Sequence, residues 1–573
     1  MAEEPKLRVL QDPSSSLALS PTFTLQTGSK ERTFQPYVSI NNSISSTQWS
    51  IVPPDPNTII RRMIWLAMPV RVTMSRAFGG PENILQYGET DAFAAYPLAS
   101  CMTTAQVQFN NASIAYPVNS FFPYLMKFKK RYELEKGFYS TFPSYLDCSQ
   151  SYEELVGTLE NPLGGYPNNS LPGCFKRGQI PIVIISNTPT SAELVALLLE
   201  PLFLSPLEFE GDNVPGLYGI KNLNINITWD NLSKMWSKAF VSPANPVTVN
   251  VSIVGVSGLP SWMPNLPTLY LRYDTPFENL SLSVPYVTPY YQLDRYTTDF
   301  GSLAAGATIS KANFQTIQSN SIPSRIYIFT RERDADISFE KPRVCSAIEG
   351  VEITFMNKAN QLATATVYDL WKMSYDNGYM GSFSEWLGNP PGLGATTFGS
   401  ILCLEFGKDI ALESGYFAGR EGTYQLQIKL TYRNPSSRPI NYTGYVVLVY
   451  PGSFITVNGS CRVTLANMPA GALAKANLIG VKEYESSNFL GGIGLGDVKT
   501  AIGLAAKGVG ALLPIIKPKL PPKWQQRAEK VGEFAKKFEG WGYGGQGTQL
   551  GEEMTENEYS GEGGEFMSLD DFT

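Results

Sequence analysis

The chain has 573 residues, of which 43% are hydrophobic and only 17% are charged, and its net charge is −6. This length predicts two or three domains, and the acidic balance argues against a protein whose main task is to coat nucleic acid. There is no histidine, which excludes Ser-His-Asp and Cys-His nucleophile systems, histidine-ligated zinc and imidazole acid–base chemistry. Carboxylate-pair, lysine or tyrosine catalysis stays open, so the absence of histidine makes an enzyme less expected without closing the question.

The six cysteines are widely spaced and form no CxxC pair. This spacing favours buried free thiols in a reducing compartment over a metal site or a disulfide framework, and no cofactor or metal site is predicted. The N-terminus has neither the basic segment nor the apolar core of a secretory signal. No uncharged apolar run reaches the roughly 18 residues that span a bilayer.

The first half of the chain is predicted to be rich in β-strands, after a flexible or partner-bound arm at residues 1–20. Expected strands are residues 22–26, 37–40, 59–74, 180–186 (as a buried strand), 217–229, 246–256 and 267–273. Residues 103–116 read as a hairpin that turns at Asn110-Asn111, because asparagine tolerates positive φ. Other expected features are a short helix or irregular apolar segment at 119–127, long loops at 130–178, and a helix or strand at 191–203.

A second set of strands follows a proline-rich crossing near residues 275–325. Expected strands are residues 322–330, 351–355, 400–406, 424–432, 444–450 and 461–465. Residues 418–434 of this set repeat the pattern of residues 215–231: AGREGTYQLQIKLTYRN aligns without a gap on PGLYGIKNLNINITWDN. Both segments place glycine before a stretch in which apolar and polar residues alternate, as in a half-buried strand.

Two further pairs of segments occur in the same order. Residues 326–328 (Ile-Tyr-Ile) match residues 64–66 (Ile-Trp-Leu), and strands ending at Phe109 and Phe355 are each followed by a turn and an aromatic-rich helical candidate. Three matches in one order predict that a single β-domain has been duplicated.

The densest charge cluster, RERDAD at residues 331–336, follows one of these strands. A functional interpretation would place a carboxylate pair or a cation site at Asp334 and Asp336, but a solvated loop or salt links between subunits is the favoured one. Arg61-Arg62 and Arg325 lead into matching strands, so these arginines are expected to be architectural.

The composition changes again after about residue 465. Amphipathic helices are expected at 496–513 and 523–541, and residues 551–573, with eight carboxylates and no Lys or Arg, are expected to be disordered. The glycine-rich stretch 491–499 follows no strand and is not read as a nucleotide site. The basic stretch 517–537 is interpreted as the polar face of a docking helix, rather than a nucleic-acid or membrane contact.

Together these segments resemble the double jelly-roll major capsid proteins of DNA viruses, closest to the Polinton-like, adintovirus and virophage group. The resemblance covers roughly residues 20–465 and is carried by IPSRIYIFTRERDADISFEKP from Ile322, GSILCLEFGKDIAL from Gly399, GTYQLQIKLTYRN from Gly422 and DAFAAYPLAS from Asp91. It implies an all-β protein of two tandem eight-stranded jelly-roll β-sandwiches, with short helices in loops. The expected domains are an arm (1–20), a first jelly roll (21–275), a second jelly roll (276–470) and a partly helical or disordered tail (471–573).

The resemblance also implies a function in assembly. Pseudo-hexagonal homotrimers would tile an icosahedral shell around a DNA genome, with the loops at 130–178 as candidates for an external tower. It implies contacts with penton and minor capsid proteins, a possible internal membrane contact through the tail, synthesis in the host cytoplasm and residence in the virion. No catalytic motif transfers, and neither enzymatic activity nor sequence-specific nucleic-acid binding is expected.

Two other classes of protein remain as alternatives. A carbohydrate-binding or attachment β-sandwich protein would need a secretion route and clustered surface tryptophans. A β-sandwich hydrolase would need two carboxylates in an acid–base setting, and the sequence offers no pair whose context demands one.

Overall fold

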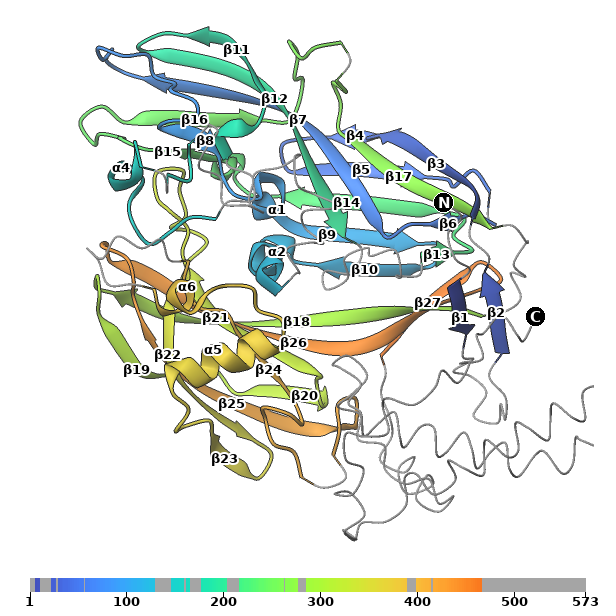
Figure 1. The fold of residues 1–573 in the computed structure, drawn as a ribbon. Coiled ribbons are helices and arrows are strands. Elements are labelled where there is room, and N and C mark those ends of the chain that lie inside the picture. Colours follow the sequence, from blue (N-terminus) through green and yellow to red (C-terminus); the bar gives the residue numbers. More distant parts are fainter. Residues whose placement is uncertain are drawn as a thin grey trace, which may run out of the picture. The chain divides into compact units, whose positions relative to one another are not determined.

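The computed structural model places both β-rich halves in one compact unit, residues 1–482, and residues 483–573 in a second (Figure 1). The residues that it describes run from 6 to 465, with gaps at 11–21, 27–28, 56, 129–145, 159–160, 165–176, 204–215, 262, 277–284, 389–397 and 414–415. The predicted tail helices and acidic end, and most of the predicted loops at 130–178, therefore lie outside the described residues.

The first half consists mainly of two facing antiparallel sheets. The strand order of one is β10-β9-β14-β5-β4, and that of the other is β11-β12-β7-β17-β6-β13, with β3 on β17 and β16 on β7. The strands are β3 (Ser29–Val38), β4 (Asn41–Asn42), β5 (Ser46–Ile51), β6 (Ile59–Ile60), β7 (Met63–Arg76), β9 (Met102–Phe109), β10 (Ala112–Tyr116), β11 (Ile182–Asn187), β12 (Ser191–Phe203), β13 (Leu217–Tyr218), β14 (Leu223–Trp229), β16 (Val247–Ser252) and β17 (Thr268–Pro276).

Two smaller pairings accompany these sheets, β1 (Lys6–Leu10) with β2 (Thr22–Gln26) and β8 (Asp91–Phe93) with β15 (Trp236–Lys238). The helices that the structure describes in this half are short and lie in connections between strands. They are α1 (Pro97–Cys101), α2 (Val118–Leu125), α4 (Tyr152–Leu155) and the 3-10 turns η1 (Met126–Phe128), η2 (Arg177–Gln179) and η3 (Leu232–Met235).

The second half has the same construction. One sheet runs β18-β26-β21-β24 with β27 on β26, and the other runs β19-β25-β22-β23 with β20 on β25. The elements are β18 (Tyr286–Leu303), β19 (Thr308–Asn313), β20 (Ile317–Ser321), β21 (Arg325–Glu332), β22 (Ala347–Phe355), β23 (Lys358–Gln361), α5 (Val367–Asp376), α6 (Phe383–Leu387), β24 (Leu402–Glu405), β25 (Glu421–Arg433), β26 (Ile440–Val457) and β27 (Ser460–Leu465).

Both halves are jelly rolls with one topology. The strand order β3-β17-β7-β12 in the first half corresponds to β18-β26-β21-β24 in the second. The order β5-β14-β9-β10 corresponds to β19-β25-β22-β23. In each half the chain crosses between its two sheets in the same sequence, which is the double Greek key of a jelly roll. The three pairs of segments matched in the sequence fall on equivalent strands: β7 with β21, β9 with β22, and β14 with β25. The predicted double jelly roll is therefore confirmed.

Local sequence explains the repeated strands. In β14 and β25 the apolar residues are buried and the polar residues between them are more exposed, as period-two patterning requires. After the matching strands β9 and β22 the chain turns at residues of positive φ, Asn110 (49°) and Met356 (56°). One hydrophobic cluster runs through both jelly rolls, so the halves are not independent cores.

The predicted buried thiols are present. In the described part of the chain Cys101, Cys345, Cys403 and Cys461 are free and buried, and Cys148 is buried as well. Burial raises the pKa of Cys101 and Cys345 to about 12, so these thiols stay protonated and unreactive at neutral pH.

Two local predictions need correction. Strand β11 was expected to be buried, but Val183, Ile184 and Ile185 are 36%, 48% and 48% exposed, because β11 is the edge strand that ends its sheet. The proline-rich crossing was not expected to hold a strand, yet it contains β18, which is the edge partner of β26, and the shorter strands β19 and β20. Residues 191–203, left open between helix and strand, form β12. No helix in the described residues is long and apolar enough to cross a membrane.

Candidate functional site: the seam between the two jelly rolls

The first jelly roll reaches the second through α2 and η1, the segment predicted as a short helix or irregular apolar stretch. Tyr124 stacks on Phe329 of β21 with ring centroids 4.9 Å apart, and Phe128 meets Tyr327 of the same strand edge-on at 4.9 Å. Buried aromatic pairs of this kind contribute about 0.5–1.5 kcal/mol each beyond the burial of their area. The outer face of β21 is thus covered by a helix from the other half of the chain.

The end of this segment is also held by polar contacts. The Met380 N–H donates to the Lys127 carbonyl (2.8 Å), and the Lys127 ammonium lies 3.2 Å from Glu385 at the start of α6. Burial opposes ionisation of Glu385, but Lys127 and the hydrogen bonds from Ser382 together lower the pKa of that carboxyl. Backbone, ionic and aromatic contacts therefore fix the first roll on the second at one place.

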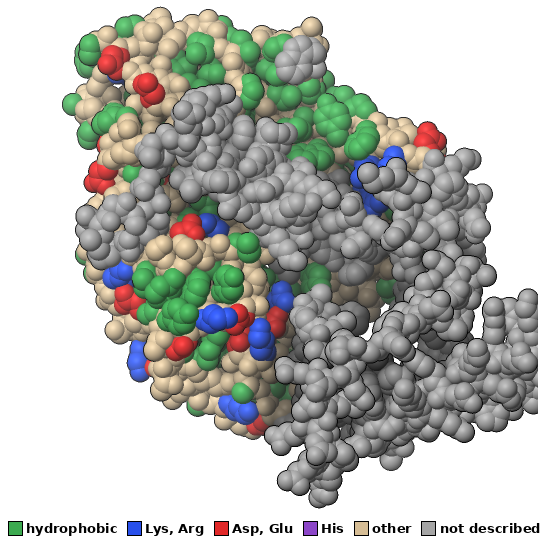
Figure 2. Space-filling model, in the orientation of Figure 1, with side chains coloured by type: hydrophobic (Ala, Val, Ile, Leu, Met, Phe, Trp, Pro, Cys, Tyr) green, Lys and Arg blue, Asp and Glu red, His purple; other side chains and the backbone are tan. Residues whose placement is uncertain are grey.

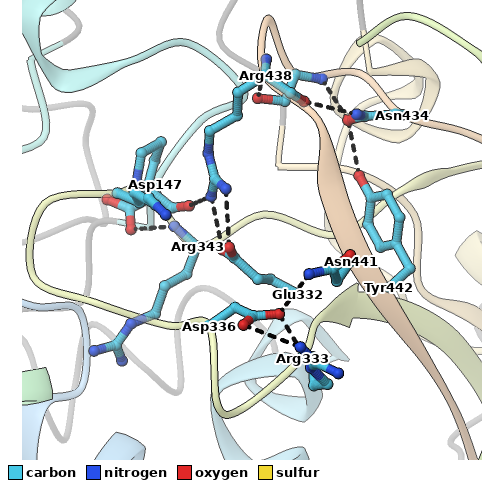
Figure 3. A network of polar contacts seen from close by, with 12 residues as sticks. Asp147, Glu332, Arg333, Asp336, Arg343, Asn434, Arg438, Asn441 and Tyr442 are labelled. Atoms are coloured by element: carbon cyan, nitrogen blue, oxygen red, sulfur yellow. Dashed lines mark hydrogen bonds and ion pairs between the residues drawn. The ribbon is translucent and has the colours of Figure 1, made fainter. Parts of the chain in front are cut away.

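A buried carboxylate, Asp147, forms the second part of the seam (Figure 3). It accepts hydrogen bonds from Arg177 and from Tyr152 (3.1 Å) of the first roll, and from the Arg343 backbone N–H of the second (2.8 Å). The Arg343 guanidinium in turn donates to the Lys234 carbonyl of the first roll. Asp147 thus accepts a hydrogen bond from the second roll, and Arg343 donates one to the first. A buried charge with several hydrogen-bond partners strongly specifies one arrangement of the two rolls.

The second roll holds Arg343 in position through a neighbouring ion pair. Arg438 binds Glu332 with both terminal nitrogens (2.8 and 2.6 Å) and also donates to the Pro342 carbonyl (3.1 Å). Figure 3 shows the Arg438 side chain directed at Glu332, next to Asn434 and Tyr442, which are hydrogen-bonded to each other (2.9 Å). The Arg438–Glu332 ion pair therefore holds the segment that carries Arg343 toward the first roll.

The charge cluster at residues 331–336 lies in this seam, and its predicted character as a solvated loop was wrong for its first two members. Arg331 and Glu332 end β21 and are each 3% exposed. The Arg331 guanidinium lies between the rings of Tyr124 (5.5 Å) and Tyr445 (4.5 Å) and pairs with Asp334 (2.6 Å). Arg331 is therefore a cationic bridge between an aromatic ring of the first roll and one of the second.

The two aspartates suggested as a carboxylate pair are separated by their partners. Burial opposes ionisation of Asp334, but the adjacent Arg331 lowers its pKa. A hydrogen bond from Arg333 lowers the pKa of Asp336, which also accepts from Asn441 (2.9 Å). An acid–base carboxylate pair needs one raised pKa, so this arrangement favours structural ion pairs over catalysis.

The far end of the seam is formed by the β9–β10 turn. Asn110 donates to the Gly459 carbonyl (2.9 Å), and the Asn111 side chain accepts from the Cys461 N–H (2.7 Å). Phe109 meets Phe454 edge-on with centroids 5.0 Å apart. The predicted turn asparagines thus do more than turn the chain, because they also clamp the β26–β27 hairpin of the second roll.

The arginines expected to be architectural hold strands within each roll. Arg61, just before β7, pairs with Asp274 of β17, and Arg325 of β21 pairs with Glu405 of β24 (2.5 Å). Among the described residues no group of three or more His, Cys, Asp or Glu side chains could hold a metal ion. The glycine-rich stretch 491–499 and the basic stretch 517–537 lie outside the described residues.

Sequence reasoning did not identify Tyr124, Asp147 or Arg343 as seam residues. One signal was available, because the segment NSFFPYLMK is apolar on all sides, which indicates a helix buried on more than one face. The partners of Asp147 and Arg343 are brought together only by the tertiary fold.

Two family profiles match this chain, one in each half. The profile described as "Sputnik virophage major capsid protein 1st domain" matches residues 7–271, and the profile "Major capsid protein V20 C-terminal domain" matches residues 293–452. The two matches follow one another in the order of the two jelly rolls.

Comparisons with whole proteins also match virophage capsid proteins. The "Putative capsid protein V20" of Sputnik virophage is 27% identical over 531 residues, which cover 89% of this chain and 88% of that protein. A chain in the cryo-EM structure of Sputnik virophage matches with a TM-score of 0.71 and 25% identity, covering 84% of this chain and 96% of that one. The mavirus major capsid protein shares the fold, with a TM-score of 0.60 and 13% identity over 82% of this chain and 97% of its own.

Proposed function

Because the chain belongs to the double jelly-roll major capsid proteins of DNA viruses, the group that includes those of virophages, we propose that it self-assembles as pseudo-hexagonal trimers that tile an icosahedral shell around a DNA genome. The observation that carries the proposal is the seam. Tyr124, Arg331 and Asp147 join two jelly rolls of one topology into a single body with a continuous core.

The physical reasoning concerns how such bodies associate. The seam is a head-to-tail contact, since α2 of one roll lies on β21 of the next and the two surfaces differ. A head-to-tail contact repeated between copies closes into a ring when the rotation permits. Three copies with two rolls each would then present roughly six-fold outlines, a shape that tiles a shell.

The finer features of this role are also proposals. The chain would act without catalysis, as the ion-paired Asp334 and Asp336 suggest, and would be made in the host cytoplasm. Contacts with penton and minor capsid proteins would complete the shell, and the tail beyond residue 470 would dock inside it on a minor protein, a membrane or a neighbouring trimer. The chain would divide into an arm (1–20), two rolls (21–275 and 276–470) and this tail.

Light scattering and electron microscopy of the purified full chain test the proposal. We expect trimers in solution and shells or hexagonal sheets at high concentration. A protein that stays strictly monomeric at high concentration would contradict it. A truncation at about residue 485 should leave trimers intact yet impair particle formation, and normal particles from that truncation would count against the role given to the tail.

A further inference from the structure

A groove lies between the two jelly rolls, next to the contact that Asn110 and Asn111 make with the β26–β27 hairpin. It has a volume of about 360 Å³ and is lined by residues 113–116 of β10, residues 290–294 of β18, and Val463 and Leu465 of β27. Figure 1 shows β10 of the first roll beside β18 and β27 of the second. Cavities of this size hold ligands or peptide side chains.

The sides of the groove are two strand edges whose backbone groups are unpaired. Alternate residues of β10 bond back to β9 across their two-residue turn, so the N–H and C=O groups of Ser113 and Ala115 point to the other side. In the β26–β27 hairpin the same alternation directs the backbone groups of Val463 and Leu465 away from β26. None of these groups bonds to another described residue. Unpaired edges of this kind are sites where a further strand can add.

One observed hydrogen bond confirms the direction of the β27 edge. The Cys461 N–H, two residues before Val463, points away from β26 and donates to the Asn111 side chain (2.7 Å). From this bond β10 and β27 run in the same direction along the chain. The groove therefore begins at Asn111 and leads toward Tyr116 and Leu465.

A buried hydroxyl in the groove also lacks a partner. Tyr116 is 6% exposed, and its hydroxyl makes no hydrogen bond within the part of the chain that the structure describes. Burial raises the pKa of Tyr116, so this hydroxyl stays protonated and can donate. A buried hydroxyl without a partner is costly, and a backbone carbonyl placed in the groove would remove that cost.

The chain itself supplies a segment that fits the groove. Leu465 is the last described residue and lines the groove, and residues 466–573 follow it. Asn467 and Pro469 are typical of turns. Residues 470–477 then read AGALAKAN, with alanine at every second position. This spacing gathers the alanines on one face of a strand but on no single face of a helix.

A chain reversal at residues 466–469 gives this segment a definite register. It would place Ala470 opposite Leu465 and Ala472 opposite Val463. Paired residues of antiparallel strands have their side chains on the same face. Val463 and Leu465 are half-buried, whereas the residues before each of them are exposed. The small alanine side chains would therefore face the interior of the groove, and Leu473 would face solvent.

We propose that residues 470–474 add to the open edge of β27 as an antiparallel strand of the same chain and fill the groove between β10, β18 and β27. Backbone hydrogen bonds to Val463 and Leu465 would hold this strand. Its attachment through a turn of a few residues would keep it at a high local concentration. This contact is independent of the proposed capsid function. It would join the C-terminal segment to both rolls, because β10 belongs to the first and β27 to the second.

Hydrogen–deuterium exchange of the full chain, followed by mass spectrometry, tests for the added strand. The amides of residues 470–474 and those of Val463 and Leu465 should exchange about tenfold or more slowly than in an unstructured peptide of the same sequence. Exchange at the rate of that peptide would overturn the proposal. Protection that disappears on dilution would mean that a second copy fills the groove, and would overturn it as well.

Two substitutions at neighbouring positions test the register. Ala472→Asp places a carboxylate on the face that meets the groove and should abolish the protection of residues 470–474, because a charge is costly to bury. Leu473→Asp changes the opposite face, and this matched control should keep the protection within about twofold. The thermal unfolding midpoint checks that both variants fold. Equal protection in the two variants would overturn the proposal.

Cross-linking identifies the surface that the segment contacts. A chain with Ala115→Cys on β10 and Leu473→Cys should be linked within one molecule by a short bismaleimide, as read from the linked peptides by mass spectrometry. The control combines Leu473→Cys with Tyr368→Cys, on helix α5, where Tyr368 is 54% exposed. Figure 2 shows the control surface, on which hydrophobic side chains gather over α5 and α6. Linkage no greater than in this control, or only between molecules, would overturn the proposal.

Discussion

The most direct perturbation of the seam is Tyr124→Ala. The Tyr124 ring is buried, stacks on Phe329 at 4.9 Å, lies 6.1 Å from Phe398 and carries the Arg331 guanidinium at 5.5 Å. Truncating a buried aromatic side chain costs about 3–5 kcal/mol. Of this, the stacking with Phe329 should account for about 0.5–1.5 kcal/mol. The rest comes from lost burial and the cavity that remains.

Urea unfolding followed by fluorescence and circular dichroism measures the effect. The unaltered chain should unfold in one transition, because a single core runs through both rolls. Tyr124→Ala should lower the free energy of unfolding and the midpoint of the transition, because the rolls lose one of the buried contacts between them. A double-mutant cycle with Phe329→Ala isolates the pair.

A buried aromatic inside the second roll provides the control. Phe355 contacts Phe406 and Tyr424 of its own roll (5.0 and 5.8 Å). Phe355→Ala should destabilise the protein by a similar amount but combine additively with Tyr124→Ala, within about 0.5 kcal/mol. The reasoning is refuted if Tyr124 and Phe329 also combine additively, or if the Tyr124 variant keeps one transition at unchanged midpoint.

Three further predictions concern single buried groups. Burial raises the pKa of Glu200 to about 7 from an ordinary 4.5. Its stabilising contribution is therefore present below pH 4.5 and is lost as pH rises through 7, by about 3 kcal/mol in all. Glu200→Gln should flatten this part of the pH profile of urea unfolding, and an unchanged slope would contradict the assignment. Asp91→Ala leaves Lys238 buried without its carboxylate, which lies 2.9 Å away, and should cost about 3–5 kcal/mol in the same assay. Gly399→Ala should cost about 2–4 kcal/mol, because Gly399 has φ +100° and an added Cβ would lie 2.2 Å from the Cys345 carbonyl oxygen; full stability in a thermal melt would contradict this.

An exposed ion pair provides the matched control for Asp91. Lys311 lies 2.7 Å from Glu352, but its side chain is 64% exposed. Lys311→Ala should change the free energy of unfolding by less than about 1 kcal/mol, because solvent screens the pair.

The double jelly roll was predictable because its sequence pattern lies within short segments and occurs twice in the chain. Alternation in β14 and β25, and the turn after Phe109, are properties of short segments that need no knowledge of the rest of the fold. Three local matches in one order then indicated the duplication. The order of strands within each sheet could not be read from these segments, and came through the resemblance.

The errors have local causes as well. The prolines of the crossing masked β18, although proline is tolerated where a strand forms the edge of a sheet. The apolar run in β11 suggested burial, but composition alone does not distinguish a central strand from an exposed edge.

The seam was the least predictable part. Asp147 and Arg343 are about two hundred residues apart in the sequence, and neither lies in a motif. The charges at 331–336 were predicted to be exposed to solvent, because runs of charged residues usually are. In the structure Tyr124 and Tyr445 stack on the Arg331 guanidinium and make its burial tolerable. Such contacts depend on how two rolls meet.

The clamp at the β9–β10 turn has a mechanical consequence. Asn110 and Asn111 of the first roll grip the β26–β27 hairpin, and β27 ends at Leu465, where the chain leaves toward its C-terminal segment. A pull on that segment would separate β27 from β26 beginning at the Leu465–Gly452 pair, and it would reach the residues bonded to Asn110 and Asn111 last. The turn of the hairpin, held by the first roll, would therefore be the last part of β27 to detach.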